Sequence, residues 1–305
     1  MKGGCIVSMA AMATVVTVVS LAPVSAAGQT PTAEAQTWTP PRTPDGQPDI
    51  QGYWNARGPT AAPTFATYTL EGGDVFDKRQ TVVAGAVPEE QWARALEARS
   101  VVVDPPSGKI PYQPWALAKR QERVEFHAHP TKPDHIDGRA RCYLPGVPRM
   151  TYSGGSQIVQ TPGYVVLLID FAHSPRIIPL DGRPHLGENI RLWQGDSRGH
   201  WEGNTLVVET TNSNDRTWLD IVGDFHSDAM RVVEHFTFVN PDTIRYDATI
   251  EDDKVFTGPW KIGLTLRRNN EPGFELWEEA CFEGQRSTTH MLHATPGAKP
   301  ADALK

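Results

Sequence analysis

The fold is decided by MRVVEHFTFVNPDTIRYDATIED, residues 230–252. Apolar and polar side chains alternate from Met230 to Phe238 and again from Ile244 to Ile250. Neighbouring residues on a strand point to opposite faces of a sheet, so each half predicts a strand with one apolar face. Because Asn-Pro-Asp at 240–242 is a turn signal, the stretch predicts an antiparallel hairpin.

The same alternation continues on both sides of this hairpin. It predicts six further strands at 156–161, 164–171, 176–181, 205–212, 260–268 and 274–282, most of them joined by short turn-rich links. Sequential strands with short links favour an antiparallel meander, and an open meander of this length would leave two exposed edges. We therefore expect a mainly β fold, an eight-stranded antiparallel barrel, with a two-sheet sandwich as the alternative.

The first 26 residues have the layout of a secretory signal. Lys2 precedes an apolar stretch, and Val24-Ser25-Ala26 is a small-residue cleavage site. The alternative is a membrane anchor, but the apolar part is shorter than the roughly 20 residues that a span requires. We expect cleavage after Ala26, export to the periplasm or medium, and no stable membrane insertion afterwards.

Composition divides the rest of the chain. Residues 27–50 form a Pro-rich tether, and residues 51–150 an N-terminal extension with helices starting at Pro88 and Pro114. The barrel is expected at 151–286, followed by a flexible tail at 287–305.

The charge and the cysteines limit the partners and the chemistry. The formal net charge is −7, and loss of Lys2 makes it more negative, which disfavours nucleic acid as a partner. Cys142 and Cys281 remain after cleavage, and in an oxidising compartment such a pair predicts a disulfide. Two buried thiols are the alternative.

Three motifs carry a resemblance: GDSRGHWEG at 195–203, NDRTWLD at 214–220 and HSDAM at 226–230. With LPGVPR at 144–149 and RIIPLDGRPH at 176–185, they resemble a widespread family of exported bacterial proteins for which no activity is established. Gly52-Tyr53-Trp54 is similar to the G-x-W of the entrance strand of lipocalins, which implies a lipocalin-like barrel.

Two carboxylates fall in apolar rows. Glu234 shares a face with Val232 and Phe236, and Glu278 shares one with Leu276. A carboxyl group in apolar surroundings tends to stay protonated, as a general acid requires. The alternative is that Glu234 pairs with an arginine and only seals the barrel.

The polar crowd around GDSRGHWEG is a second candidate. Its glycines permit a tight turn that directs Asp196, Arg198, His200 and Glu202 to one side, where the guanidinium could bind a carboxylate. A structural ion-pair cluster at the barrel rim would have the same sequence.

The loops after the strand at 205–212 are a third candidate. His226 beside Asp215 would form an oriented imidazole able to transfer protons, although turn-forming Asn and Asp explain the same pattern. Because the ten histidines show no tight ligand spacing, we expect no metal and no cofactor.

These candidates predict an exported enzyme that acts on a small apolar or aromatic molecule by cofactor-independent acid-base chemistry, of the lyase, isomerase, cyclase or hydrolase type. A non-catalytic carrier and a carbohydrate-active sandwich are the alternatives. The expected catalytic residues are Glu234, Glu278, His226, Asp215 and Asp196. The expected substrate-binding residues are Arg198, His200, Glu202, Arg216, Trp193, Trp218 and Tyr246.

Overall fold

The computed structural model describes residues 38–57, 69–71, 100–127, 129–152, 154–172, 174–276, 279 and 287–293. The remaining residues include the expected signal, the expected helix at Pro88, and Glu278 and Cys281, which therefore lie outside the described part of the chain.

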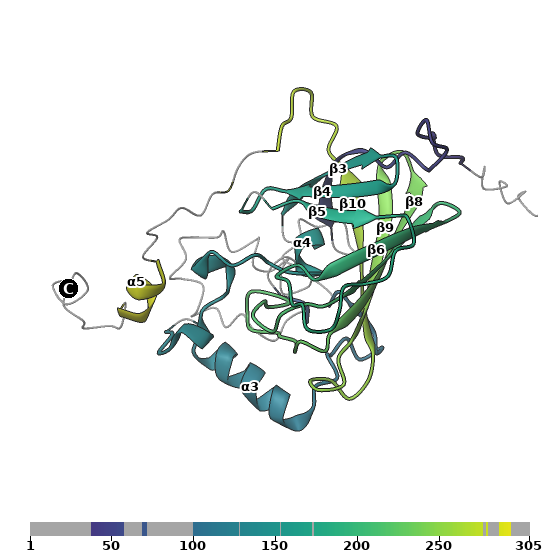
Figure 1. Ribbon diagram of the computed structural model, residues 1–305. Helices are drawn as coiled ribbons and strands as arrows, with labels where there is room; N and C mark the ends of the chain where they lie inside the picture. The colour runs from purple at the N-terminus through teal and green to yellow at the C-terminus, as the bar shows by residue number, and fades with distance from the viewer. Residues whose placement is uncertain are drawn as a thin grey trace, which may run out of the picture. The chain divides into compact units, whose positions relative to one another are not determined.

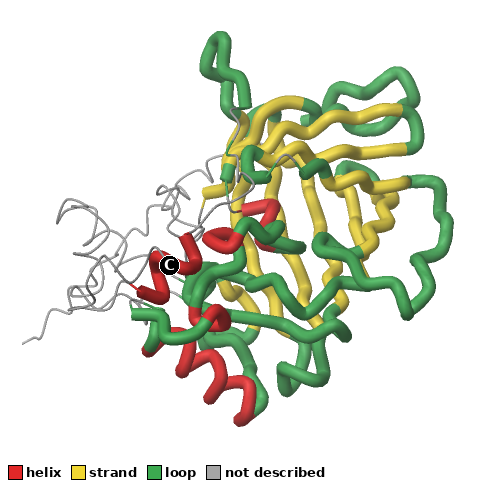
Figure 2. Tube along the Cα trace, turned by 60° about the vertical axis from the view of Figure 1, so that its left-hand side comes forward, coloured by secondary structure: helices red, strands yellow, loops and turns green. Residues whose placement is uncertain are grey.

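The strands form an antiparallel, nearly closed barrel, as predicted (Figures 1 and 2). Nine strands follow the order β5-β4-β3-β1-β10-β9-β8-β7-β6, and β2 pairs with β10 beside this path. The strands are β1 (Gly52–Arg57), β2 (Val102–Asp104), β3 (Gly155–Thr161), β4 (Tyr164–Ile169), β5 (Arg176–Pro179), β6 (Asp196–Glu202), β7 (Thr205–Thr211), β8 (Arg231–Asn240), β9 (Thr243–Glu251) and β10 (Trp260–Arg268).

The seam of the barrel, where β5 faces β6, is closed by side chains. These two strands are the ends of the hydrogen-bonded order. A Cβ atom on Gly199 of β6 would lie 2.8 Å from Cγ2 of Ile178 and 2.9 Å from Cδ2 of Leu180. The absence of a side chain at Gly199 therefore lets β5 pack closely against β6.

Three strands, β1, β2 and β6, were not predicted, and β2 lies in the expected N-terminal extension. β1 falls in the stretch expected as an extension, yet it pairs with β3 on one side and β10 on the other. Its Trp54 is buried, donates from Nε1 to the Ile50 carbonyl at 2.9 Å, and lies under the guanidinium of Arg268. β6 occupies the segment expected as a tight turn. In the expected strand at 274–282, residues 274–276 are not in a strand and Glu279 forms only an isolated bridge with Phe171, while the other residues lie outside the described part of the chain.

The helices are short. α3 (Pro114–Glu125) begins with proline at its first position, as predicted. The other helical segments are α4 (Arg149–Tyr152), α5 (Ser287–His293), and the 3-10 turns η3 (Pro133–His135) and η4 (Arg139–Arg141). α5 lies in the stretch expected as a flexible tail. No helix in the described ranges combines the length and the apolar character needed to cross a bilayer.

The inner face of the barrel is a packed core. The predicted alternation is confirmed, because the inward residues of β8 and β9 are buried, including Glu234 and Tyr246. All four residues of α4 are also buried: Thr151 donates to Glu234 at 3.3 Å and Tyr152 donates to the Leu219 carbonyl at 2.6 Å. α4 therefore packs into the same core as the strands.

The second half of the expected tether is packed as well. Trp38 meets the ring of Phe238 edge-on at 4.7 Å, and Ile50 is fully buried. The Ile50 amide donates to Gln160 Oε1 at 2.8 Å. These apolar contacts fix residues 38–50 to the barrel despite their proline content. Cys142 is disulfide-bonded, and its expected partner is outside the described residues.

Candidate functional site

The polar crowd of GDSRGHWEG lies along one strand rather than in a turn. On β6, Ser197 and Gly199 are buried, whereas Arg198 and His200 are at least partly exposed. This alternation places the polar side chains on the outer face of the barrel. Asp196 belongs to that outer row but is itself buried, because a neighbouring loop covers it.

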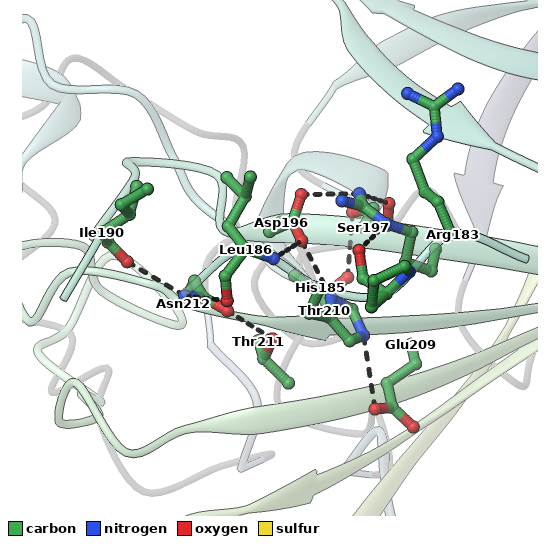
Figure 3. Close-up of polar contacts among 12 residues, drawn as sticks. Arg183, His185, Leu186, Ile190, Asp196, Ser197, Glu209, Thr210, Thr211 and Asn212 are labelled. Carbon is green, nitrogen blue, oxygen red and sulfur yellow. Dashed lines mark hydrogen bonds and ion pairs between the residues drawn. The ribbon is translucent and has the colours of Figure 1, made fainter. Parts of the chain in front are cut away.

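A chain of three polar side chains joins that loop to the sheet, and we call it the imidazole cluster: His185, Asp196 and Glu209. His185 Nδ1 lies 3.0 Å from Asp196 Oδ2, and its Nε2 lies 3.3 Å from Glu209 Oε1 (Figure 3). The side chain of His185 is 24% exposed and that of Glu209 is 38% exposed. The imidazole is thus held between two carboxylates while part of it still meets solvent.

Asp196 is fixed by three donors. It accepts hydrogen bonds from His185 and from the Leu186 amide, both at 3.0 Å, and from Arg198 Nη1 at 2.6 Å. A carboxylate accepts hydrogen bonds, so the His185 tautomer that fits this contact has its proton on Nδ1. The same arrangement fixes the orientation of the ring.

Arginine holds the other carboxylate of the imidazole cluster. Arg231 of β8 binds Glu209 and also Glu251 of β9, the latter at 3.0 Å. Its hydrogen bond lowers the pKa of Glu209 against a smaller opposing effect of burial. Glu209 is therefore charged at neutral pH and places a negative charge beside Nε2 of His185.

Asn212 pins the loop that carries His185. Its Nδ2 lies 3.3, 3.0 and 3.0 Å from the carbonyl oxygens of Leu186, Gly187 and Ile190 (Figure 3). Its own carbonyl accepts from the Leu192 amide at 2.8 Å. With φ of 58°, Asn212 has the left-handed conformation that asparagine tolerates better than most residues.

The same loop exposes apolar side chains beside the imidazole cluster. Leu186, Ile190 and Leu192 are each about two-fifths exposed. The Leu186 amide binds the same Asp196 carboxylate that holds His185, so this partly apolar loop is attached to the imidazole cluster.

His226 is placed differently from expectation. It is buried, with Nε2 2.7 Å from the Thr217 hydroxyl and Nδ1 2.8 Å from the Ser227 carbonyl. Burial lowers its pKa, so the ring is neutral at neutral pH. Both ring nitrogens are occupied by these partners, whereas Asp215 is exposed. Among the described contacts no hydrogen bond or ion pair joins the two residues, although the charge of Asp215 acts on the His226 ring.

Glu234 lies at the centre of a buried network. Arg176 binds both of its carboxylate oxygens, and Tyr246 donates to Oε1 at 2.9 Å. Arg176 also donates to Ser197 at 3.0 Å and to Thr210 at 2.9 Å. This is the arginine-paired arrangement that the sequence left open as the alternative.

The other expected residues are dispersed. His200 and Glu202 are exposed and pair with each other at 2.9 Å. Trp218 is buried beneath the guanidinium of Arg123, with 4.7 Å from the guanidinium carbon to the ring centroid. Trp193 packs on Tyr143 with ring centroids 4.6 Å apart, and the guanidinium of Arg216 lies 6.0 Å from the Trp193 ring.

Sequence reasoning identified Asp196 and Arg198 but did not select His185, Glu209 and Arg231. The sequence did contain a signal for Glu209. Neighbouring residues on a strand face opposite sides, so Glu209 lies on the outer face when Val208 and Thr210 face the core, and Arg198 lies on the same outer face. No local pattern predicts that the loop returns His185 to this position.

Comparison of the chain with protein-family models, curated proteins and solved structures gives no match. Within the described residues, no three His, Cys, Asp or Glu side chains form a group suited to a metal ion.

Proposed function

We propose that this protein is an exported enzyme that transfers protons on a small, largely apolar organic molecule, with His185 as the group that gives and takes the proton. The observation that carries the proposal is the imidazole cluster. In it, a partly exposed histidine is oriented by a buried aspartate and faces a second carboxylate across its other nitrogen.

Each member has a role in this scheme. Asp196 orients the ring and stabilises its positive form, as carboxylates paired with catalytic histidines do. Glu209 lies 3.3 Å from Nε2, which is longer than an ordinary N–H···O hydrogen bond. A modest movement of its exposed side chain would open Nε2 to a substrate.

The surroundings favour an apolar substrate with one polar group. Leu186, Ile190 and Leu192 supply exposed apolar surface, and Arg198 is a nearby cation whose planar fork suits a carboxylate or an enolate oxygen. Arg198 also donates to the Pro184 carbonyl at 3.1 Å, which fixes its position at the edge of the loop.

The barrel core supports this location over the interior site first expected. Trp54, Tyr152, Phe236, Tyr246 and Trp260 are all buried to 99% or more. In addition, Glu234 is already bound by Arg176 through both oxygens. We therefore place the reaction on the outer face, at the loop that follows β5.

The test is turnover of small molecules from the producing cell, followed by mass spectrometry. We expect the unmodified protein to convert at least one molecule, and His185→Gln to lower that rate by about 10²-fold or more. His200→Gln is the matched control, because His200 lies on the same outer face and its imidazole has a polar contact with Glu202 and none with the imidazole cluster among the described residues. Equal loss in both variants, or full activity of His185→Gln, would contradict the proposal.

A carrier remains the second candidate, and a specific observation favours it: both ring nitrogens of His185 and the guanidinium of Arg198 have partners in the protein. Stoichiometric binding of an extract component without product would select the carrier over the enzyme.

A further inference from the structure

Two aspartates, Asp220 and Asp224, lie in one tight loop that the proposed function does not use. Both are completely buried. The loop closes on itself through the hydrogen bond from the Leu219 amide to the Asp224 carbonyl at 2.7 Å, and Trp218 and Phe225 form a bridge at its base. We call Asp220 and Asp224 the carboxyl pair.

Backbone amides surround Asp220. Its Oδ1 accepts from the amides of Val222, Gly223 and Asp224 at 3.0 to 3.1 Å. Its Oδ2 accepts from the amide of Leu70 at 3.3 Å. Asp220 therefore joins its own loop to the short described segment 69–71.

Asp224 has one satisfied and one unsatisfied oxygen. Its Oδ1 accepts from the Tyr112 hydroxyl at 2.8 Å and from Arg120 Nε at 3.1 Å. Its Oδ2 is buried and has no hydrogen-bond partner. A buried carboxylate oxygen without a donor is costly, so its lack of a partner requires an explanation.

Around the carboxyl pair, the buried carboxylates outnumber the buried cations that bind them. Arg120 serves Asp224 and also Glu71, whose Oε2 lies 3.6 Å from Arg120 Nη2. Lys109 approaches Glu71 at 3.7 Å, but its side chain is half exposed. Within the described residues, no basic side chain forms an ion pair with Asp220, so two neighbouring carboxylates share one buried guanidinium.

The remaining neighbours form no ion pair with Asp220 or Asp224 within the described residues, although the charge of Asp220 acts on Arg149. Burial raises the pKa of Tyr112 and Tyr152 well above the usual range, and both hydroxyls are neutral. Arg149 is committed to Asp137, which it binds through both nitrogens at 2.7 and 2.6 Å. Arg123 contacts the Gly223 carbonyl and pairs with Asp134.

We propose that Asp220 and Asp224 share a single proton. The hydrogen bond that this proton forms between them keeps residues 69–71 and α3 attached to the barrel in a pH-dependent way, and we call this bond the latch. Protonated Asp220 donates to the otherwise unpartnered Oδ2 of Asp224, which completes the hydrogen bonds of the pair. Loss of the proton leaves two carboxylates in contact in a buried site, and their repulsion weakens the contacts that both make.

The contacts at stake join distant parts of the chain. Asp220 holds Leu70, and Glu71 accepts from the amide of Ile110 at 2.6 Å. Asp224 holds Tyr112 and, through Arg120, the middle of α3. Release of the pair would loosen both segments together without requiring the barrel strands to separate.

The direction of the pH effect follows from the proton. Burial, followed by the charge of Asp224, raises the pKa of Asp220 well above its usual range. The folded protein thus binds a proton that the unfolded chain releases near its ordinary pKa of about 4. The stabilising contribution is fully present below that pH and is lost as pH rises through the folded pKa.

The decisive measurement is infrared spectroscopy of the full protein between about pH 5 and pH 9, where ordinary surface carboxyls are ionised. We expect one protonated-carboxyl C=O band that shifts in D₂O and disappears on alkaline titration. We also expect Asp224→Asn to abolish it. In that variant the new amide nitrogen donates to Asp220 Oδ2, so the latch no longer needs a proton.

Asp253→Asn is the matched control, because it removes the charge of an exposed aspartate outside the pair. This variant should keep the band. Hydrogen exchange at the Leu70 amide, corrected for its intrinsic pH dependence, should accelerate at alkaline pH in the unmodified protein and not in Asp224→Asn. Absence of the band at every pH in the unmodified protein, or its persistence in a folded Asp224→Asn variant, would overturn the proposal. Neither result depends on catalytic activity.

Discussion

At the scale of single residues, the ion pair between Arg176 of β5 and Glu234 of β8 joins two distant strands inside the core. Alternation placed Glu234 in the apolar row of β8, and the structure confirms that face. The partner comes from β5, on the other side of the seam, and no period in either strand encodes a contact across the barrel. The same reason explains why His185 was not joined to Asp196 from sequence.

Replacement of Glu234 tests its role directly. Glu234→Gln leaves Arg176 buried without a countercharge, so we expect a loss of about 3 to 5 kcal/mol in the free energy of unfolding, measured with urea. Turnover per folded molecule should be unchanged if the reaction takes place at His185.

A double variant controls for this cost. Arg176→Met combined with Glu234→Leu removes both charges and should recover most of the lost stability, because apolar residues of similar volume often replace a buried ion pair without net loss. A double variant less stable than Glu234→Gln would indicate that the pair itself contributes strongly to the fold.

At the scale of elements, the long strands with an extended apolar row were predictable, whereas the short β1 and β2 and the polar β6 were not. β7, β8, β9 and β10 show clear alternation and were located from sequence. β6 presents Ser197, Gly199 and Trp201 to the interior, and the first two are too polar or too small to indicate a strand. Its formation depends on pairing with β7 and on β5 packing against Gly199.

The seam between β5 and β6 provides a test at this scale. Gly199→Ala places a methyl group within 3 Å of Ile178 and Leu180, so one of the two strands must move. We expect a loss of about 1 to 3 kcal/mol, the usual range for overpacking.

Gly258→Ala is the control for Gly199→Ala, because a Cβ atom there meets nothing within 4 Å and its φ is not positive. The midpoint of thermal unfolding should be clearly lower for Gly199→Ala than for Gly258→Ala. Equal midpoints would mean that the seam accommodates extra volume and does not depend on this glycine.

At the scale of the whole molecule, the sequence predicted a barrel but did not predict which segments belong to it. The sequence divides near residue 150 by composition, yet β1 lies between β3 and β10 and residues 38–50 pack on the barrel. Composition reports the local density of proline and polar residues, whereas membership of a core depends on a few side chains such as Trp38 and Ile50. The described fold therefore extends at least to Trp38, well before the boundary near residue 150.

Two shortened chains test this boundary. A chain that begins at residue 27 should unfold at the same urea concentration as the full chain, because the contacts of Trp38 and Ile50 are kept. A chain that begins at residue 51 loses both side chains and the acceptor of Trp54 Nε1. We expect it to be less stable by about 3 kcal/mol or more. Equal stability of the two chains would contradict the assignment of residues 38–50 to the fold.

The position of β1 also has a consequence for the order in which the chain folds. β1 pairs with β10, so Trp54 meets Arg268 only after more than two hundred intervening residues have been made. Contacts this distant in sequence slow folding, since the entropy of closing the loop is lost before the pairing is gained. Until then β1, β3 and β10 present unpaired edges, which are the usual starting points of aggregation during synthesis. The hairpins from β6 to β10 can form early from local contacts, whereas ring closure through β1 must come late.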